Sequence, residues 1–114
     1  MSMKHLMAVA PLAASALLAA APAQALDAAA AKALAGNNAC LACHAVDRKL
    51  VGPSYKDVAA KHKGQANALE IVAARIKSGG AGIYGPVPMP AQPNLKDDEL
   101  KLLAAWVLAG APDK

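Results

Sequence analysis

The sequence predicts one small all-α domain of about four helices. Three observations lead to this prediction. The chain has 114 residues, which is enough for a single small domain. Apolar residues recur at helical spacing in segments that glycine and proline separate, and no segment shows the alternation of a strand. The length excludes a multidomain enzyme, and the net charge of +4 is too small to indicate nucleic-acid binding.

Residues 1–25 have the pattern of a signal peptide. A short basic start precedes an apolar run over residues 6–23, and Ala23-Gln24-Ala25 supplies a small-x-small cleavage site. An uncleaved anchor is the alternative, but prolines and alanines make the run weakly apolar for a span of about 20 residues. We expect cleavage after Ala25, which leaves residues 26–114 as the mature domain in the periplasm, without stable insertion in the membrane.

The first two helices are expected over residues 27–35 and 54–61. Asp27 is a suitable N-cap for the alanine-rich first helix, and Gly36-Asn37-Asn38 is expected to end it. The second helix is short and begins at Ser54, directly after Gly52-Pro53. The chain before it, from residue 45 to residue 53, is expected to be a loop.

The other two helices are expected to begin near residues 67 and 96. Asn67 with Glu70 three residues later forms an N-terminal capping pattern, and Gly79-Gly80 stops that helix. Acidic residues at the start of the last helix suit its positive N-terminal dipole. The apolar faces consist of Leu69, Val72, Ala73 and Ile76 in the third helix, and of Leu100, Leu103, Ala104, Val107 and Leu108, with Trp106 beside them, in the fourth.

The segment between the last two helices, residues 79–94, contains four glycines and four prolines in 16 residues. A loop of this length in a small domain is usually functional or disordered. Its prolines reduce the entropy that is lost when the loop is ordered. Met89 stands between two of them and is the only methionine after the leader. This placement indicates that the loop presents the Met89 side chain for a functional role.

The residues with the most specific chemistry are Cys40-Leu41-Ala42-Cys43-His44, which match the attachment signature of c-type haem. Two thiols three residues apart on a helical turn can each bond one vinyl group of a single haem, and His44 can then ligate the iron. A disulfide, a thioredoxin-like pair and a zinc site are the alternatives. However, no βαβ pattern surrounds the motif, and His62, which lies 18 residues further on, has poor spacing for zinc. A haem would also supply the large aromatic body that this chain lacks.

The sixth iron ligand decides whether the iron carries electrons or binds small molecules. Met89 is the leading candidate, although the alternative is that it only fills a gap in the hydrophobic core. His62 is the weaker candidate, because Lys61-His62-Lys63-Gly64 has the composition of a solvated helix end.

Four motifs in the same chain resemble the small bacterial class I cytochromes c of the c-551 type, also called c8. They are Cys40–Asp47, Val51–Ala59, Gly85–Pro90 and Ala105–Leu108. The resemblance covers essentially all of residues 26–114. It implies a small cytochrome c fold around one haem c, attached through Cys40 and Cys43, with His44 and Met89 as the metal ligands.

The resemblance also implies roles for residues that surround the cofactor. Pro53 corresponds to the proline whose carbonyl accepts the ring N–H of the proximal histidine, here His44. Arg75 corresponds to an arginine that binds a haem propionate. Tyr84 stands where many members carry tryptophan, so its hydroxyl is expected to reach the same propionate.

Two further contacts follow from the resemblance. Gln92 lies three residues after Met89, where relatives often have an amide that contacts the methionine sulfur, and Asn94 is a competitor for this role. The first helix lacks the aromatic residue that some members pack on the last helix. Leu34 and Trp106 are expected to make that contact instead.

The resemblance implies a periplasmic electron carrier, not an enzyme, that works as a monomer. It suggests a cytochrome bc complex as donor and a nitrite reductase or terminal oxidase as acceptor. Lysines around the haem side would steer acidic partners, or would simply keep the protein soluble. They are Lys49, Lys56, Lys61, Lys63 and Lys77. The alternative function is a peroxidase-like or gas-binding haem protein whose Met89 ligand is displaceable.

Overall fold

A computed structural model describes residues 7–15 and 26–114. Residues 7–15 are exposed and have no regular secondary structure. The expected cleavage site at residues 23–25 lies outside the described residues, as do most of the other leader positions. Within the described ranges, no helix has both the length and the apolar character needed to cross a membrane.

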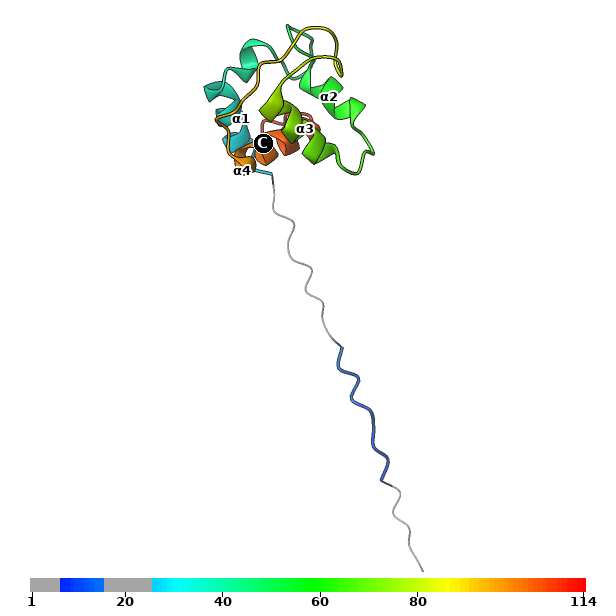
Figure 1. Ribbon diagram of the computed structural model, residues 1–114. Coiled ribbons are helices and arrows are strands. Elements are labelled where there is room, and N and C mark those ends of the chain that lie inside the picture. The colour runs from blue at the N-terminus through cyan, green and yellow to red at the C-terminus, as the bar shows by residue number, and fades with distance from the viewer. Residues whose placement is uncertain (1–6, 16–25) are drawn as a thin grey trace, which may run out of the picture.

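Four α-helices and one 3-10 turn form the domain, so the predicted all-α class is confirmed (Figure 1). The described residues contain no strand and only two isolated bridges, one between His44 and Lys49 and one between Gly80 and Met89. The elements in chain order are α1 (Ala28–Asn37), η1 (Cys40–Ala42), α2 (Tyr55–Lys61), α3 (Ala68–Ser78) and α4 (Asp97–Leu108).

The starts of α1 and α2 are both capped by a side chain, and of these two caps the one at Asp27 was predicted. The Asp27 carboxylate accepts a hydrogen bond from the Ala30 N–H at 2.9 Å. The Ser54 hydroxyl oxygen accepts one from the Asp57 N–H at 3.0 Å. Each bond satisfies a backbone donor that has no partner within the helix. The end of α1 differs slightly from the expectation, because the helix continues to Asn37 before it stops.

The predicted cap of α3 is wrong, whereas the predicted start of α4 is confirmed. The Asn67 side chain makes no capping hydrogen bond, because its backbone (φ −107°, ψ 25°) lies outside the extended region that an N-cap residue adopts. At α4, the Glu99 carboxylate accepts a hydrogen bond from the backbone N–H of Lys96 at 3.0 Å. Three acidic residues in the first turn of α4 also suit the helix dipole.

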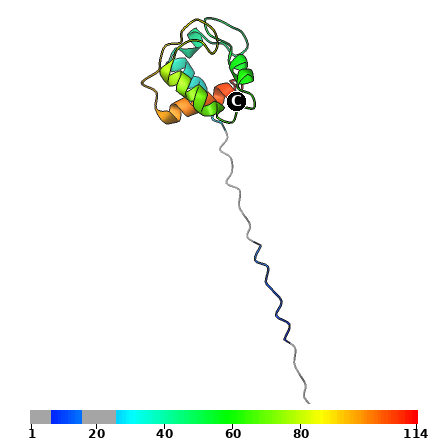
Figure 2. The same cartoon turned by 45° about the vertical axis from the view of Figure 1, so that its right-hand side comes forward.

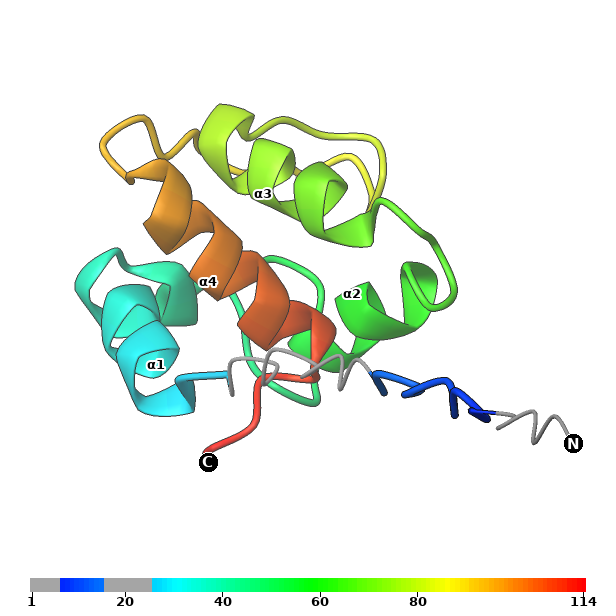
Figure 3. The ribbon, with the colours of Figure 1, turned by 90° about the horizontal axis from the view of Figure 1, so that it is seen from below.

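Helix α4 is the centre of the core, and α1, α2 and α3 each pack against it (Figure 3). Helix α1 meets α4 through buried alanines, which allow a close approach of the two backbones. Leu34 lies at the edge of this contact, packed against the core that contains Trp106. The buried residues of α4 are Leu100, Leu103, Ala104, Trp106 and Val107.

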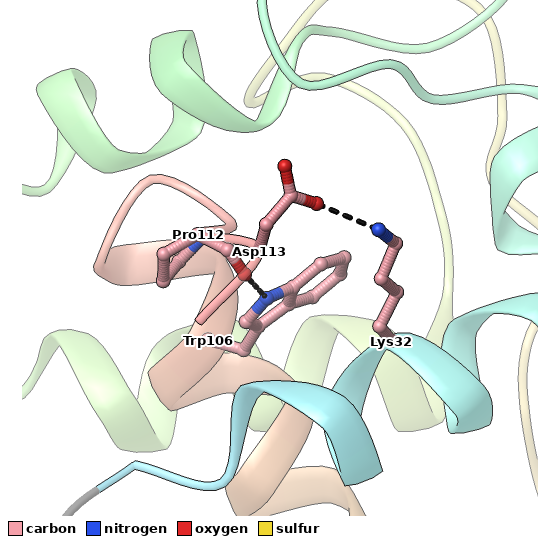
Figure 4. A network of polar contacts seen from close by, with 4 residues as sticks. All are labelled: Lys32, Trp106, Pro112 and Asp113. Atoms are coloured by element: carbon pink, nitrogen blue, oxygen red, sulfur yellow. Dashed lines mark hydrogen bonds and ion pairs between the residues drawn. The ribbon is translucent and has the colours of Figure 1, made fainter.

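Two polar contacts hold the C-terminal segment against α1 and α4. The Trp106 indole N–H donates to the carbonyl of Pro112 at 2.9 Å, and the Lys32 ammonium pairs with Asp113 at 2.6 Å (Figure 4). The indole is 2% exposed, so its single donor needs this carbonyl. The ion pair itself is exposed and contributes little to stability.

Candidate cofactor site

One large apolar pocket lies between α2, α3, α4 and the loop that follows α3. It offers about 1180 Å³ of space, a volume that includes solvent outside its open mouth. Figure 2 shows these elements arranged round a common centre. Helices α2 and α3 both contact α4 but do not contact each other, which leaves room for a bulky ligand between them. The apolar walls include Val58, Val72, Ile76, Leu103 and Val107.

The cysteine motif forms one side of the pocket. Ala39 has a left-handed backbone (φ 59°) that turns the chain from α1 into η1. The η1 turn then places Cys40, Cys43 and His44 on the pocket lining. The His44 backbone N–H donates to the Cys40 carbonyl at 3.0 Å, which closes the turn.

The His44 ring is held in one orientation by its neighbours. Its Nδ1 lies 2.7 Å from the carbonyl oxygen of Pro53, which is the hydrogen bond that the resemblance implied. Since a carbonyl can only accept, Nδ1 carries the proton and Nε2 keeps its lone pair for a metal. The Tyr55 ring also stacks on His44, with centroids 5.2 Å apart and an interplanar angle of 20°.

Gly52 allows the backbone to pass directly beside this ring. A Cβ atom at Gly52 would lie 2.5 Å from Cε1 of His44, closer than such atoms approach. The Gly52 N–H donates to the Cys43 carbonyl at 2.8 Å, which fixes the segment there. The glycine is therefore required by the position of His44.

The surroundings of Cys40 differ from those of a redox-active cysteine. Both thiols of the motif are free, and burial raises the pKa of the Cys40 thiol, an effect that a backbone hydrogen bond only partly opposes. Redox-active cysteines have a lowered pKa, so this environment disfavours the thioredoxin-like alternative. Among the residues that the structure describes, no group of three or more His, Cys, Asp or Glu side chains could hold a metal ion.

Met89 enters the same pocket from the loop after α3. Gly80 and Met89 exchange two backbone hydrogen bonds of 2.9 Å, so the intervening residues form a closed lobe. Gly79 stands at its base with φ 64°, and a Cβ there would lie 2.4 Å from the Met89 carbonyl oxygen. The loop thus brings a thioether to the pocket that also contains His44.

Arg75 and Tyr84 line the pocket, as expected of residues that bind a propionate. The Arg75 guanidinium donates to the carbonyls of Gly79 at 3.3 Å and Ala81 at 3.5 Å, and it thereby supports the loop. Burial raises the pKa of the Tyr84 hydroxyl, and the positive charge of Arg75 opposes that change. The Tyr84 hydroxyl has a protein partner, His62, which the sequence did not indicate.

Gln92 does not line the pocket. Its backbone N–H donates to the carbonyls of Ile76 at 3.2 Å and Lys77 at 3.1 Å, which attaches the end of the loop to α3. Asn94 is exposed. A contact between the Gln92 amide and the Met89 sulfur stays a prediction.

The expectation of a solvated His62 is wrong. His62 is only 6% exposed, whereas the neighbouring Lys61 and Lys63 are exposed. Its Nδ1 bonds the Gln65 side-chain oxygen at 2.6 Å, and its Nε2 bonds the Tyr84 hydroxyl. Because both ring nitrogens are already bonded and His62 itself does not line the pocket, it is a poor candidate for the sixth ligand.

The residues present fit a c-type haem. The pocket brings together two unpaired thiols, an imidazole whose Nδ1 bonds the Pro53 carbonyl, and a thioether from another segment. Apolar walls suit the flat face of a porphyrin, and the Arg75 cation suits its carboxylates.

Comparison with known families and sequences identifies similar proteins. The family model described as "Cytochrome c" matches residues 28–111, a span that contains every pocket residue. Cytochrome c-551 of Pseudomonas aeruginosa is 58% identical over 74 residues, which cover 64% of this chain and 69% of the relative. Cytochrome c-551 of Azotobacter vinelandii is 54% identical over 69 residues, which cover 60% of this chain and 83% of the relative.

Solved structures share the fold. Wild-type cytochrome c552 of Nitrosomonas europaea is 43% identical with a TM-score of 0.66, and the match covers 69% of this chain and 98% of that one. The class 1 cytochrome MtoD of Sideroxydans lithotrophicus ES-1 is 35% identical with a TM-score of 0.68, and that match covers 77% and 100%.

Proposed function

The chain belongs to the cytochrome c family as a small class I, c-551-type monohaem electron carrier with one covalent haem c, and we propose that it works in the periplasm with His/Met-ligated iron. When bound, the haem supplies a one-electron change at its iron. Cys40 and Cys43 would hold it covalently, and His44 and Met89 would ligate the metal. One observation carries the proposal, namely that these four side chains line a single pocket.

His44 would bind the iron through Nε2. The Pro53 carbonyl accepts the Nδ1 proton, so the ring keeps its tautomer and its orientation while the charge of the cofactor changes. This bond also makes the imidazole a stronger donor. Gly52 and Tyr55 restrict the ring further, which reduces the rearrangement between oxidation states.

Met89 would fill the position that an oxygen- or peroxide-binding protein leaves open. A thioether ligand also favours the reduced state, which raises the reduction potential. The closed lobe between Gly80 and Met89 holds the side chain at the pocket, whose walls are mostly apolar. These features support electron transfer over catalysis, so we propose no enzymatic activity.

Arg75 would meet a propionate at the rim of the pocket and provide the positive charge there. The Tyr84 ring would line the same rim beside that propionate, while its hydroxyl bonds His62. Gln92 remains a candidate contact for the Met89 sulfur from the end of the loop.

The open side of the pocket suits brief contact with redox partners. Val51 and Val87 line the pocket and are 56% and 57% exposed, so they form part of an apolar rim. Such small surfaces suit weak, rapidly released complexes. The proposed donor is a cytochrome bc complex, and the proposed acceptor is a nitrite reductase or a terminal oxidase. We propose that the carrier is a monomer, and that residues 1–25 direct its export and are then cleaved.

Steering by lysine is a separate proposal. If Lys49 and Lys56 attract acidic partners, Lys49→Glu with Lys56→Glu lowers the association rate at low salt and flattens its salt dependence. An unchanged salt dependence would mean that these lysines only solubilise the protein.

The absorption spectrum of the oxidised, matured protein tests the proposed ligation. The weak far-red band that reports sulfur-to-iron charge transfer is expected in the wild type and should disappear in Met89→Ala. Val87→Ala is a matched control in the same loop and should keep the band. Absence of the band from the wild type, or carbon monoxide binding to the reduced protein at neutral pH, would instead support a gas-binding or peroxidase-like haem protein.

A further inference from the structure

A hydrogen bond between His62 and Tyr84 links two parts of the domain that are otherwise separate. His62 ends α2, and Tyr84 lies in the loop that follows α3. The two helices pack on α4 without contacting each other. The bond therefore spans from one wall of the pocket to the loop at the other wall.

The loop is attached to α3 mainly at its base. Gly80 pairs with Met89 through two backbone hydrogen bonds, and Gln92 bonds the end of α3. Between these points the lobe is closed by a backbone bond of 2.9 Å from the Gly82 N–H to the Gly85 carbonyl. Tyr84 stands in that turn, at the far end of the lobe from its base, so its hydroxyl ties the tip of the lobe to α2.

The contacts of the His62 ring leave Nε2 able to accept this hydrogen bond. The Gln65 side-chain oxygen, 2.6 Å from Nδ1, is an acceptor and places the ring proton on Nδ1. Nε2 is then free to accept the proton of the Tyr84 hydroxyl. Burial of His62 excludes water that would compete for the same nitrogen.

We propose that His62 is a positioning residue, which holds the tip of the loop against α2 through Tyr84 and thereby keeps Met89 at the pocket. This inference rests on the proposed role of Met89 as iron ligand. Without the bond, the lobe would be a flap hinged at Gly79 and Gly80. Met89 would then leave the pocket more often, although the fold as a whole would persist.

Competition by imidazole in the oxidised holoprotein measures how often Met89 leaves. Imidazole replaces Met89, so loss of the far-red band reports its binding, and its apparent affinity rises with the open fraction of the loop. A typical hydrogen bond corresponds to a change of about threefold to tenfold in such an equilibrium. His62→Phe and Tyr84→Phe should each tighten imidazole binding by about that factor.

The double variant should bind imidazole no tighter than the stronger single variant, because both changes remove the same bond. His62→Gln should stay close to the wild type, since its amide can still accept from Tyr84. Leu100→Ala is the control for general destabilisation. Leu100 is buried in α4 and does not line the pocket, so this variant should unfold earlier without tightening imidazole binding.

Additive effects of the two single variants, or an equal tightening in Leu100→Ala, would overturn the positioning role. Failure of the Met89 proposal has a different signature. In that case the wild type lacks the far-red band, and Met89→Ala binds imidazole no tighter than the wild type does.

Discussion

The two sides of the pocket are built in different ways. On the His44 side, the bonds join residues close in sequence, such as Nδ1 of His44 to the Pro53 carbonyl and the Gly52 N–H to the Cys43 carbonyl. On the Met89 side, the lobe closes on itself and reaches another helix through a bond across 22 residues. Local bonds form at a low entropic cost, whereas remote ones require the rest of the fold. The Met89 side should therefore open first.

The largest expected effect comes from Gly79→Ala, at the base of the loop. The added Cβ would meet the Met89 carbonyl oxygen at 2.4 Å, and the backbone (φ 64°, ψ −155°) is one that only glycine adopts easily. Strain and overpacking together should lower the free energy of unfolding by about 3 kcal/mol or more. Guanidinium titration followed by circular dichroism measures this.

Gly82→Ala is the matched control in the same loop. It also has a positive φ, of 111°, but a Cβ there meets nothing within 4 Å. We expect only the backbone strain, about 1–2 kcal/mol. Equal losses in the two variants would show that the close approach at Met89 is unimportant.

Gly52→Ala examines the His44 side and should cost about 2 kcal/mol, because the ring must move away and weaken its bond to Pro53. The backbone at Gly52 is not in the left-handed region, so the whole effect would arise at the ring. The NMR resonance of the His44 Nδ1 proton should shift or disappear.

Gly36→Ala is the control for Gly52→Ala, and we expect the opposite sign. Gly36 lies within α1, and a Cβ there would meet nothing within 4 Å. The substitution should raise stability by about 0.5 kcal/mol. An unchanged Nδ1 resonance in Gly52→Ala would contradict the proposed constraint on His44.

A smaller effect is expected at the helix starts next to each side. Ser54 follows Pro53 and caps α2, so Ser54→Ala should lower stability by about 1 kcal/mol. Asn67 makes no capping bond, so Asn67→Ala should have almost no effect. Thermal unfolding of the two variants gives the comparison. A loss in Asn67→Ala as large as that in Ser54→Ala would mean that Asn67 does cap α3.

The smallest effect concerns the exposed pair of Lys32 and Asp113, which touches neither side of the pocket. A hydrogen bond and the charge of Lys32 lower the pKa of Asp113 below its ordinary value of 3.8. A carboxyl whose pKa is lower in the folded state stabilises the fold above its ordinary pKa and loses this contribution as the pH falls through the folded pKa.

The difference in stability between wild type and Asp113→Asn should therefore be small at pH 7 and shrink towards zero in acid. Denaturant titrations at several pH values measure it. A difference that grows in acid would contradict the ion pair, and a change in the far-red band would contradict its independence from the pocket.

Local signals predicted the parts of the site that depend on local structure. The Cys40–His44 motif, the short helix after Gly52-Pro53 and the breaker at Gly79-Gly80 all lie where the sequence placed them. The prediction of an N-cap at Asn67 failed because a capping pattern describes side chains and not the backbone angles of the capping residue. The prediction that His62 is solvated failed because its flanking lysines are exposed and its partner, Tyr84, is distant in sequence.

Patterns a few residues long were enough to predict the helices and the haem-attachment motif with His44. Met89 was a candidate ligand because it is the single methionine after the leader and stands between two prolines. The groups that surround these candidate ligands depend instead on how the folded helices pack together. Gly52 lies against the His44 ring, Gly79 against the Met89 backbone, and His62 holds Tyr84. Such contacts depend on how α2 and α3 pack on α4, and no pattern along the chain reports the distance between two faces that meet only after folding.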